Sequence, residues 1–237
     1  MRIRKLTTVL AAAMMVCSIG MTANAAENDM PAYSEEELRI YEELYAQDQI
    51  AVAEMMENLP QMLAEGQELA KYDAKANDPM PMSNSLGTYG DIIVNTSGST
   101  SLGSIGISYI GHAAIVSNDA NITIESWPKS NSPIDIDGVQ QYDNDWAGVS
   151  GTMLVRPNGA TTTQYRTAVA FAEKQIGKPY NWNFLNKNTT DSFYCSQLVW
   201  QAWLDAGINC ETGSTPNAVI APADLVNSTN TYVVRTV

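Results

Sequence analysis

The change of periodicity near Gly90 is the feature that most restricts the fold of this chain. Before it, apolar residues recur at steps of three and four, as on one face of a helix. After it come short runs rich in Ile and Val, bounded by Gly, Asn, Ser or Pro. These runs predict strands over residues 91–95, 112–117, 121–127, 152–156 and 231–237, and helices are predicted over 163–176 and 195–206. Strands first and helices afterwards indicate an α+β fold with an antiparallel sheet.

Residues 26–76 form a predicted acidic helical arm. It opens with a capping box, Ser34 and Glu37, and residues 27–75 contain 13 acidic and 3 basic residues. The charge is interpreted as a solvated helical face in preference to an acidic interaction tail. The predicted apolar stripe consists of Leu38, Tyr41, Tyr45, Val52, Met55, Leu59, Met62 and Leu69, interrupted by Asp48 and Gly66. Since Pro60 removes a helical hydrogen bond, a helical hairpin or a kinked helix is expected.

Composition divides the rest of the chain. Residues 77–89 are rich in Pro, Asn, Ser and Met and are interpreted as a linker to a domain over 90–237. Residues 1–25 are typical of a secretory signal peptide, with basic residues first, an uncharged run, and small residues at the cleavage position. Cleavage leaves 10 basic and 26 acidic residues, a net charge of −16, so nucleic acid and anionic membranes are poor partners.

Export is therefore the expected fate of the chain. Cys17 raises the alternative of a lipoprotein, but Val16 is bulky where a lipobox has a small residue. We expect a secreted or extracytoplasmic protein of the cell envelope without a stable membrane anchor. The sequence does not indicate an oligomeric state.

A cysteine and a histidine are the candidate reactive groups. Cys195 lies at the start of a predicted helix, where free N–H groups and the helix dipole favour a thiolate. Alternatively it is an inert core residue, or forms a disulfide with Cys210. His112 is the only histidine and lies in a predicted strand. If the hairpin after it has an even loop, His112 faces Trp127 with Glu125 diagonally beside it, whereas an odd loop puts Glu125 on the other face.

Two motifs add a family resemblance. Gly-Lys-Pro-Tyr-Asn-Trp-Asn-Phe, residues 177–184, and Tyr-Cys-Ser-Gln-Leu-Val-Trp, residues 194–200, resemble the signature of NlpC/P60 cysteine hydrolases. In usual members the histidine follows the cysteine, but here it precedes it, in Gly-His-Ala-Ala-Ile-Val. This order resembles the circularly permuted, papain-like YiiX/YaeF branch. The resemblance covers residues 90–207 and implies a papain-like α+β domain with its antiparallel sheet packed on helices.

The resemblance also implies roles for particular residues. Cys195 matches the nucleophile, His112 the base, Glu125 the acidic residue on the next strand, and Tyr180 the tyrosine bordering the thiol, which is equally interpretable as a packed core aromatic. The sequence departs from the pattern where Asn183 and Phe184 replace a Gly-Gly pair and where Phe193 and Tyr194 replace Phe-Asp. Substrate contacts are expected to differ accordingly.

Three functions are compatible with these residues. The first is a cysteine peptidase or amidase acting through a thioester on an extracytoplasmic amide, with peptidoglycan peptide as the implied substrate class. The second is a thiol acyl hydrolase or acyltransferase on an acyl-amide or other lipid-like substrate, and the third is a non-catalytic wall-associated binding module. No cofactor is expected, and one histidine without paired Cys or His spacing argues against a metal site.

Overall fold

The structure, a computed structural model, describes residues 31–78, 84–101, 108–212 and 219–237. The predicted signal peptide lies outside these residues, as does part of the predicted linker. Residues 85–88 of that segment are buried against the domain, and Leu86 is fully buried.

One six-stranded sheet organises the domain. The strands are β1 (Ile92–Ser101), β2 (Ser108–Val116), β3 (Ile122–Trp127), β4 (Gly138–Asp143), β5 (Thr152–Pro157) and β6 (Thr231–Thr236). Their order is β4-β3-β2-β1-β5-β6, and every neighbouring pair is antiparallel. The helices are α1 (Glu35–Ala70), α2 (Thr162–Glu173), α3 (Cys195–Asp205) and α4 (Pro222–Asn227). The predicted α+β fold with an antiparallel sheet is confirmed.

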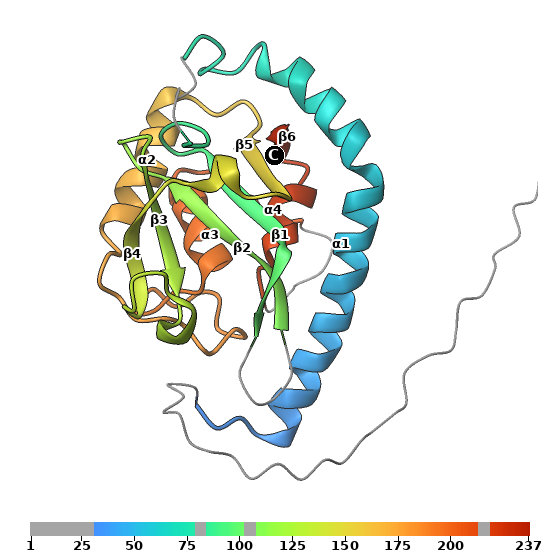
Figure 1. Ribbon diagram of the computed structural model, residues 1–237, viewed down its shortest axis with the longest axis vertical. Helices are drawn as coiled ribbons and strands as arrows, with labels where there is room; N and C mark the ends of the chain where they lie inside the picture. Colours follow the sequence, from blue (N-terminus) through green and yellow to red (C-terminus); the bar gives the residue numbers. More distant parts are fainter. Residues whose placement is uncertain (1–30, 79–83, 102–107, 213–218) are drawn as a thin grey trace, which may run out of the picture.

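The two faces of the sheet are buried by different layers. Ile92 and Val94 belong to the large core that includes α2 and α3, which lie together behind the sheet in Figure 1. Ile93 and Leu154 point to the opposite face and join a smaller core with Leu86, against which Trp146 packs. Successive side chains of a strand point to opposite faces, so a continuous apolar run satisfies both layers. Among the described residues that cover this second face, Leu86 lies in a loop and Trp146 in a short 3₁₀ helix.

Helix α1 is continuous, so of the two predicted alternatives, a helical hairpin and a kinked helix, the hairpin is wrong. Pro60 lies inside the helix at an exposed position, where water can solvate the backbone carbonyl that its missing N–H leaves without a partner. The predicted capping box at Ser34 and Glu37 is present. Figure 1 shows the helix lying along one side of the domain, where it contacts β6 and α4.

The face that α1 buries differs in part from the predicted stripe. Tyr41 and Met55 are buried as expected, but Leu69 is exposed. Asp48 and Gly66, predicted to interrupt the stripe, are both buried against the domain. At Gly66 the helix approaches the backbone of β6 so closely that only a glycine fits.

We predict that Gly66→Ala destabilises the protein, although alanine is intrinsically the better helix former. An alanine Cβ at this position would lie 1.9 Å from the carbonyl oxygen of Val233, so α1 or β6 must shift. Overpacking of this kind typically costs about 1–3 kcal/mol. The free energy of unfolding from urea titration measures the effect. Gln67→Ala, at an exposed neighbouring position, is the matched control, and an equal or higher stability of Gly66→Ala would contradict the close approach.

Two elements were not predicted from the sequence. Strand β4 has the sequence Gly-Val-Gln-Gln-Tyr-Asp, which is too polar to read as a core strand, and it forms the edge of the sheet. Gly138 begins it with φ of 78°, and a side chain there would meet the carbonyl of Lys178. Helix α4 spans only six residues. Its recognisable signal was Pro222 at the first helical position, with Asp224 accepting a hydrogen bond from the backbone N–H of Ala221.

A buried ionic cluster ties the segment after α1 to the sheet. The ammonium of Lys75 lies 2.5 Å from Asp91, and Arg156 binds both carboxylate oxygens of Asp91, at 2.8 and 3.2 Å. All three side chains are at most 4% exposed. Burial raises the pKa of the Asp91 carboxyl, but the two adjacent cations outweigh this effect and the net pKa is lowered.

Candidate active site

Cys195 is the first residue of α3, as predicted, and is 9% exposed. Gln197, fully buried, organises this helix start. Its side-chain oxygen accepts hydrogen bonds from the backbone N–H of Tyr194 and from Asn181, and its amide donates to the carbonyls of Lys187 and Thr189. Because this one amide ties the helix start to three points of the chain that leads into α3, it fixes the sulfur at the positive end of the helix.

His112 lies on β2 opposite the position of Trp127 on β3. The strands pair Ile115 with Ile124 and Val116 with Thr123, so four residues form the loop and the even register holds. The imidazole and the indole of Trp127 stack with ring centroids 3.6 Å apart and an interplanar angle of 14°. The prediction that His112 faces Trp127, with Glu125 on the same side, is confirmed.

Glu125 is a buried carboxylate that accepts four hydrogen bonds. The Nε2–H of His112 and the indole N–H of Trp127 donate to Oε2, at 2.7 and 2.8 Å, while Thr123 and the indole N–H of Trp146 donate to Oε1, at 2.5 and 3.0 Å. Burial raises the pKa of Glu125, but these donors and the imidazolium charge outweigh it, so the net pKa is lowered. The carboxylate therefore stays ionised and directs Nδ1 of His112 towards the thiol.

The thiol and the imidazole are electrostatically paired. Burial raises the pKa of Cys195, but the charge and hydrogen bond of His112, together with the backbone N–H of Ala113, lower it below its ordinary value. For His112, burial lowers the pKa, and the opposing effects of Cys195 and Glu125 raise it to about 9. A thiolate–imidazolium pair is the form that this site favours near neutral pH.

We predict that alkylation of Cys195 by iodoacetamide stays rapid below pH 8. A lowered thiol pKa keeps the thiolate populated at pH values where an ordinary thiol is protonated. In His112→Ala the helix start, the backbone N–H of Ala113 and the hydroxyl of Ser196 remain against burial, but the largest effect that lowers the thiol pKa is lost. The pKa therefore rises, and labelling at pH 7 slows by about tenfold or more. Peptide mass spectrometry over a pH series measures the rate. Equal labelling of Cys195 in both proteins would contradict the pairing.

A narrow apolar pocket of about 20 Å³ borders the sulfur. Tyr180, 7% exposed, lines it together with Phe184 and Tyr194, so Tyr180 lies beside the thiol as expected. Phe184, which departs from the expected glycine, packs edge-on against Tyr41 of α1, with ring centroids 5.8 Å apart. Helix α1 thereby supports the wall of the Cys195 pocket.

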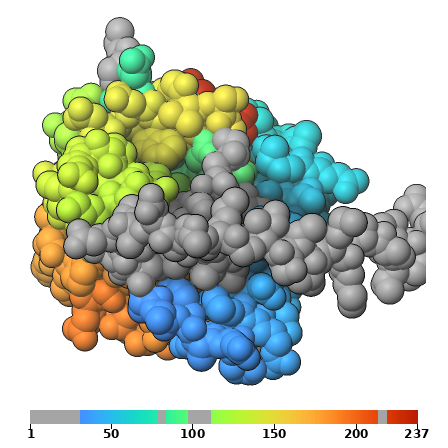
Figure 2. All heavy atoms as spheres, turned by 60° about the horizontal axis from the view of Figure 1, so that its bottom comes forward, coloured from blue at the N-terminus to red at the C-terminus, as the bar shows by residue number. Residues whose placement is uncertain are grey.

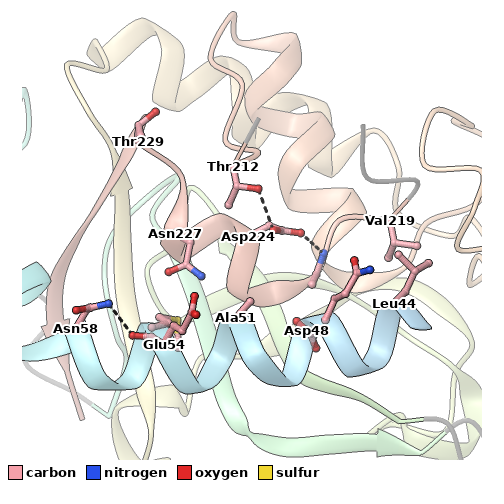
Figure 3. A pocket seen from close by; sticks show the side chains of 13 residues that line it. Leu44, Asp48, Ala51, Glu54, Asn58, Thr212, Val219, Asp224, Asn227 and Thr229 are labelled. Carbon is pink, nitrogen blue, oxygen red and sulfur yellow. Dashed lines mark hydrogen bonds between the residues drawn. The ribbon is translucent and has the colours of Figure 1, made fainter. Parts of the chain in front are cut away.

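The largest of the described cavities lies elsewhere, between α1 and α4 (Figure 3). Its volume is about 620 Å³, and it shares Val219 with the Cys195 pocket. Asp224 points across it but is hydrogen-bonded to Thr212 and to the N–H of Ala221, at 3.2 and 2.8 Å. The cavity contains neither the thiol nor the imidazole and is not the reaction centre.

Cys195 and Cys210 are both free thiols, so the alternative of a disulfide between them does not hold in this structure. Among the described residues, no group of three or more His, Cys, Asp or Glu side chains is arranged to hold a metal ion. None of the described helices is both long and apolar enough to span a membrane.

Comparison with known proteins identifies the family. Residues 88–233, more than half of the chain, match the model of the permuted papain-like amidase enzymes YaeF/YiiX, the C92 family. The chain belongs to this family. It is also similar to the uncharacterized protein YycO of Bacillus subtilis (strain 168), with 29% identity over 131 residues, which cover 54% of this chain and 49% of YycO. The chain thus matches about half the length of that relative. No solved structure matches significantly.

Two side chains of this C92 family member were missed at the sequence level. Thr123 lies two residues before Glu125 on the same strand, so its position on the same face was available from the strand period. Trp146 comes from a short 3₁₀ helix, Trp146–Gly148, between β4 and β5. Its indole is parallel to the His112 ring, with centroids 5.7 Å apart. Nothing in the local sequence pairs Trp146 with Glu125, because the chain between them forms the unpredicted edge strand.

Proposed function

We propose that this protein is an exported cysteine amidase in which Cys195 is the nucleophile, His112 the general base and acid, and Glu125 the group that orients the imidazole. The observation that carries the proposal is the buried chain of contacts from Glu125 through His112 to a thiol at a helix start. Membership of an amidase family supports the same reaction class. Tyr180 is proposed to border the bound substrate.

The reaction follows from these positions. The Cys195 thiolate attacks the amide carbonyl, and the tetrahedral oxyanion is stabilised by the backbone N–H of Cys195 at the start of α3. The imidazolium of His112 protonates the leaving nitrogen as the C–N bond breaks, which leaves a thioester and a neutral imidazole. The imidazole then deprotonates a water molecule that attacks the thioester, releasing a carboxylic acid and restoring the thiolate–imidazolium pair.

The substrate class and location are proposed from the sequence. A signal peptide over residues 1–25 would deliver the chain outside the cytoplasm, where the peptide amides of a cell wall would be within its reach. The pocket lined by Tyr180 and Phe184 has room for about one water-sized group, so only a small group fits there next to the scissile bond. We therefore propose an extracytoplasmic peptide amide, with peptidoglycan peptide as the first substrate to test.

A comparison of matched substrates tests the reaction class. Purified chain is incubated with soluble peptidoglycan peptides and with acyl esters and acyl amides of equal chain length, and the release of amine or alcohol is followed. Faster release from the peptides, abolished in His112→Ala, supports the peptide amidase. Preferential release from acyl esters would move the function to lipid acyl hydrolysis, and no release from any substrate would favour a binding module.

A further inference from the structure

A second pocket adjoins the back of the proposed catalytic site. It has a volume of about 400 Å³ and lies on the sheet face opposite α3, where Glu125, Trp127 and Trp146 form part of its wall. The same three side chains hold His112 in place. The segment 133–149, which supplies most of the lining, forms the surface coloured lime to yellow in Figure 2.

Aromatic rings dominate the described wall of this pocket. Trp127, Tyr142 and Trp146 contribute three rings, and each ring is anchored through its polar atom. Both indoles donate to Glu125, and the hydroxyl of Tyr142 lies 3.2 Å from that of Ser132. Ile134 and Val149 at the rim leave 44% and 40% of their surface exposed. Such a lining stabilises an apolar or π-binding group and offers few hydrogen bonds.

The charges around the pocket favour one of two ligands, a neutral apolar group or an organic cation. Asp143 and Asp145 line it and are exposed, whereas the described lining contains no lysine or arginine. The imidazolium of His112 does not neutralise these carboxylates, because it is paired with both Glu125 and the Cys195 thiolate. A neutral apolar group would use only the aromatic walls. An organic cation would use the rings through cation–π attraction and the two aspartates through their charge.

We propose that this pocket is a binding site for an alkylammonium group, formed by Trp127, Tyr142 and Trp146 with Asp143 and Asp145 at its margin. Only the statement that the alkylammonium group belongs to a substrate rests on the proposed amidase function. Trp127 lines this pocket and also stacks on His112, so a cation held here would contact the same ring that supports the proposed base. Substrates with an amine or quaternary ammonium would thereby be selected over anionic ones.

Binding of isosteric probes tests the site without turnover. Choline and 3,3-dimethylbutan-1-ol have nearly the same shape, but only choline is charged. Titration of the purified chain, followed by calorimetry and ligand-observed NMR, is expected to show choline binding about fivefold or more tightly than the neutral isostere. The double variant Asp143→Asn with Asp145→Asn is expected to reduce that preference several-fold. Tyr142→Leu is expected to weaken choline binding by removing one ring.

The control is Asp205→Asn, which makes the same charge change at an exposed position at the end of α3. It is expected to leave choline affinity unchanged. Equal affinity for the two probes, absence of choline binding, or an equal loss in the Asp205 variant would each overturn the proposal. Since no measurement here depends on catalysis, a chain without amidase activity would refute the proposed function and still give a clear result for this site.

Discussion

Replacing Cys195 with alanine is expected to lower amide hydrolysis by about 10⁴-fold or more while the chain remains folded. The sulfur forms the covalent bond in the proposed reaction. Because the nucleophile and its base work together, loss of the nucleophile alone removes nearly all of the rate enhancement. Because Cys195 lies at the surface of a narrow pocket, alanine leaves only a small void. Initial rates on the best amide substrate measure activity, and circular dichroism with urea titration measures folding.

The matched control for this experiment is Cys210→Ala. Cys210 is fully buried, its pKa is raised to about 12 by burial, and it does not line the Cys195 pocket. Its thiol is therefore not ionised near neutral pH, and its loss is expected to change the rate less than twofold. Retention of activity in Cys195→Ala, or an equal loss in Cys210→Ala, would exclude Cys195 as the nucleophile.

Replacing Asp91 with asparagine is expected to lower the free energy of unfolding by about 3–5 kcal/mol. The carboxylate compensates two buried cations, Lys75 and Arg156, which lie 2.5 and 2.8 Å away. Asparagine preserves the size of the side chain but removes the nearest counter-charge of both buried cations, and the remaining carboxylate, Asp73, lies 3.8 Å from Arg156. The urea midpoint and slope at pH 7 measure the change.

The pH dependence of stability gives a second readout for Asp91. Its folded pKa is lowered, so its stabilising contribution is fully present above the unfolded pKa of about 4 and is lost as the pH falls through the folded value. Asp91→Asn should lose this part of the acid sensitivity. The control is Glu68→Gln, which breaks an exposed ion pair with Lys71 and is expected to have little effect. A similarly small effect in Asp91→Asn would mean that the cluster is solvated.

Local patterns were sufficient to predict most of the elements. Five of the six strands, the three longest helices and the start of α3 at Cys195 follow from the period of the apolar residues and from caps, glycines and prolines in the sequence. These signals depend on neighbouring residues alone. These local signals are weak in the polar edge strand β4 and in the six-residue helix α4. Both elements form because they pack against other elements, and the sequence-based interpretation missed them.

For the candidate active site too, the sequence and the tertiary structure determined different things. The sequence alone identified Cys195, His112 and Glu125 as candidate reactive groups. A reactive residue type at a predicted helix start or within a predicted strand can be recognised before the fold is known. The contact between them was decided by tertiary structure, since 83 positions separate the thiol from the imidazole and only sheet register and helix packing join them. The same holds for Trp146, whose bond to Glu125 crosses an edge strand, and for Gly66, whose role comes from the proximity of β6. Distances of this kind depend on how elements remote in sequence pack together, which residue type and local spacing do not encode.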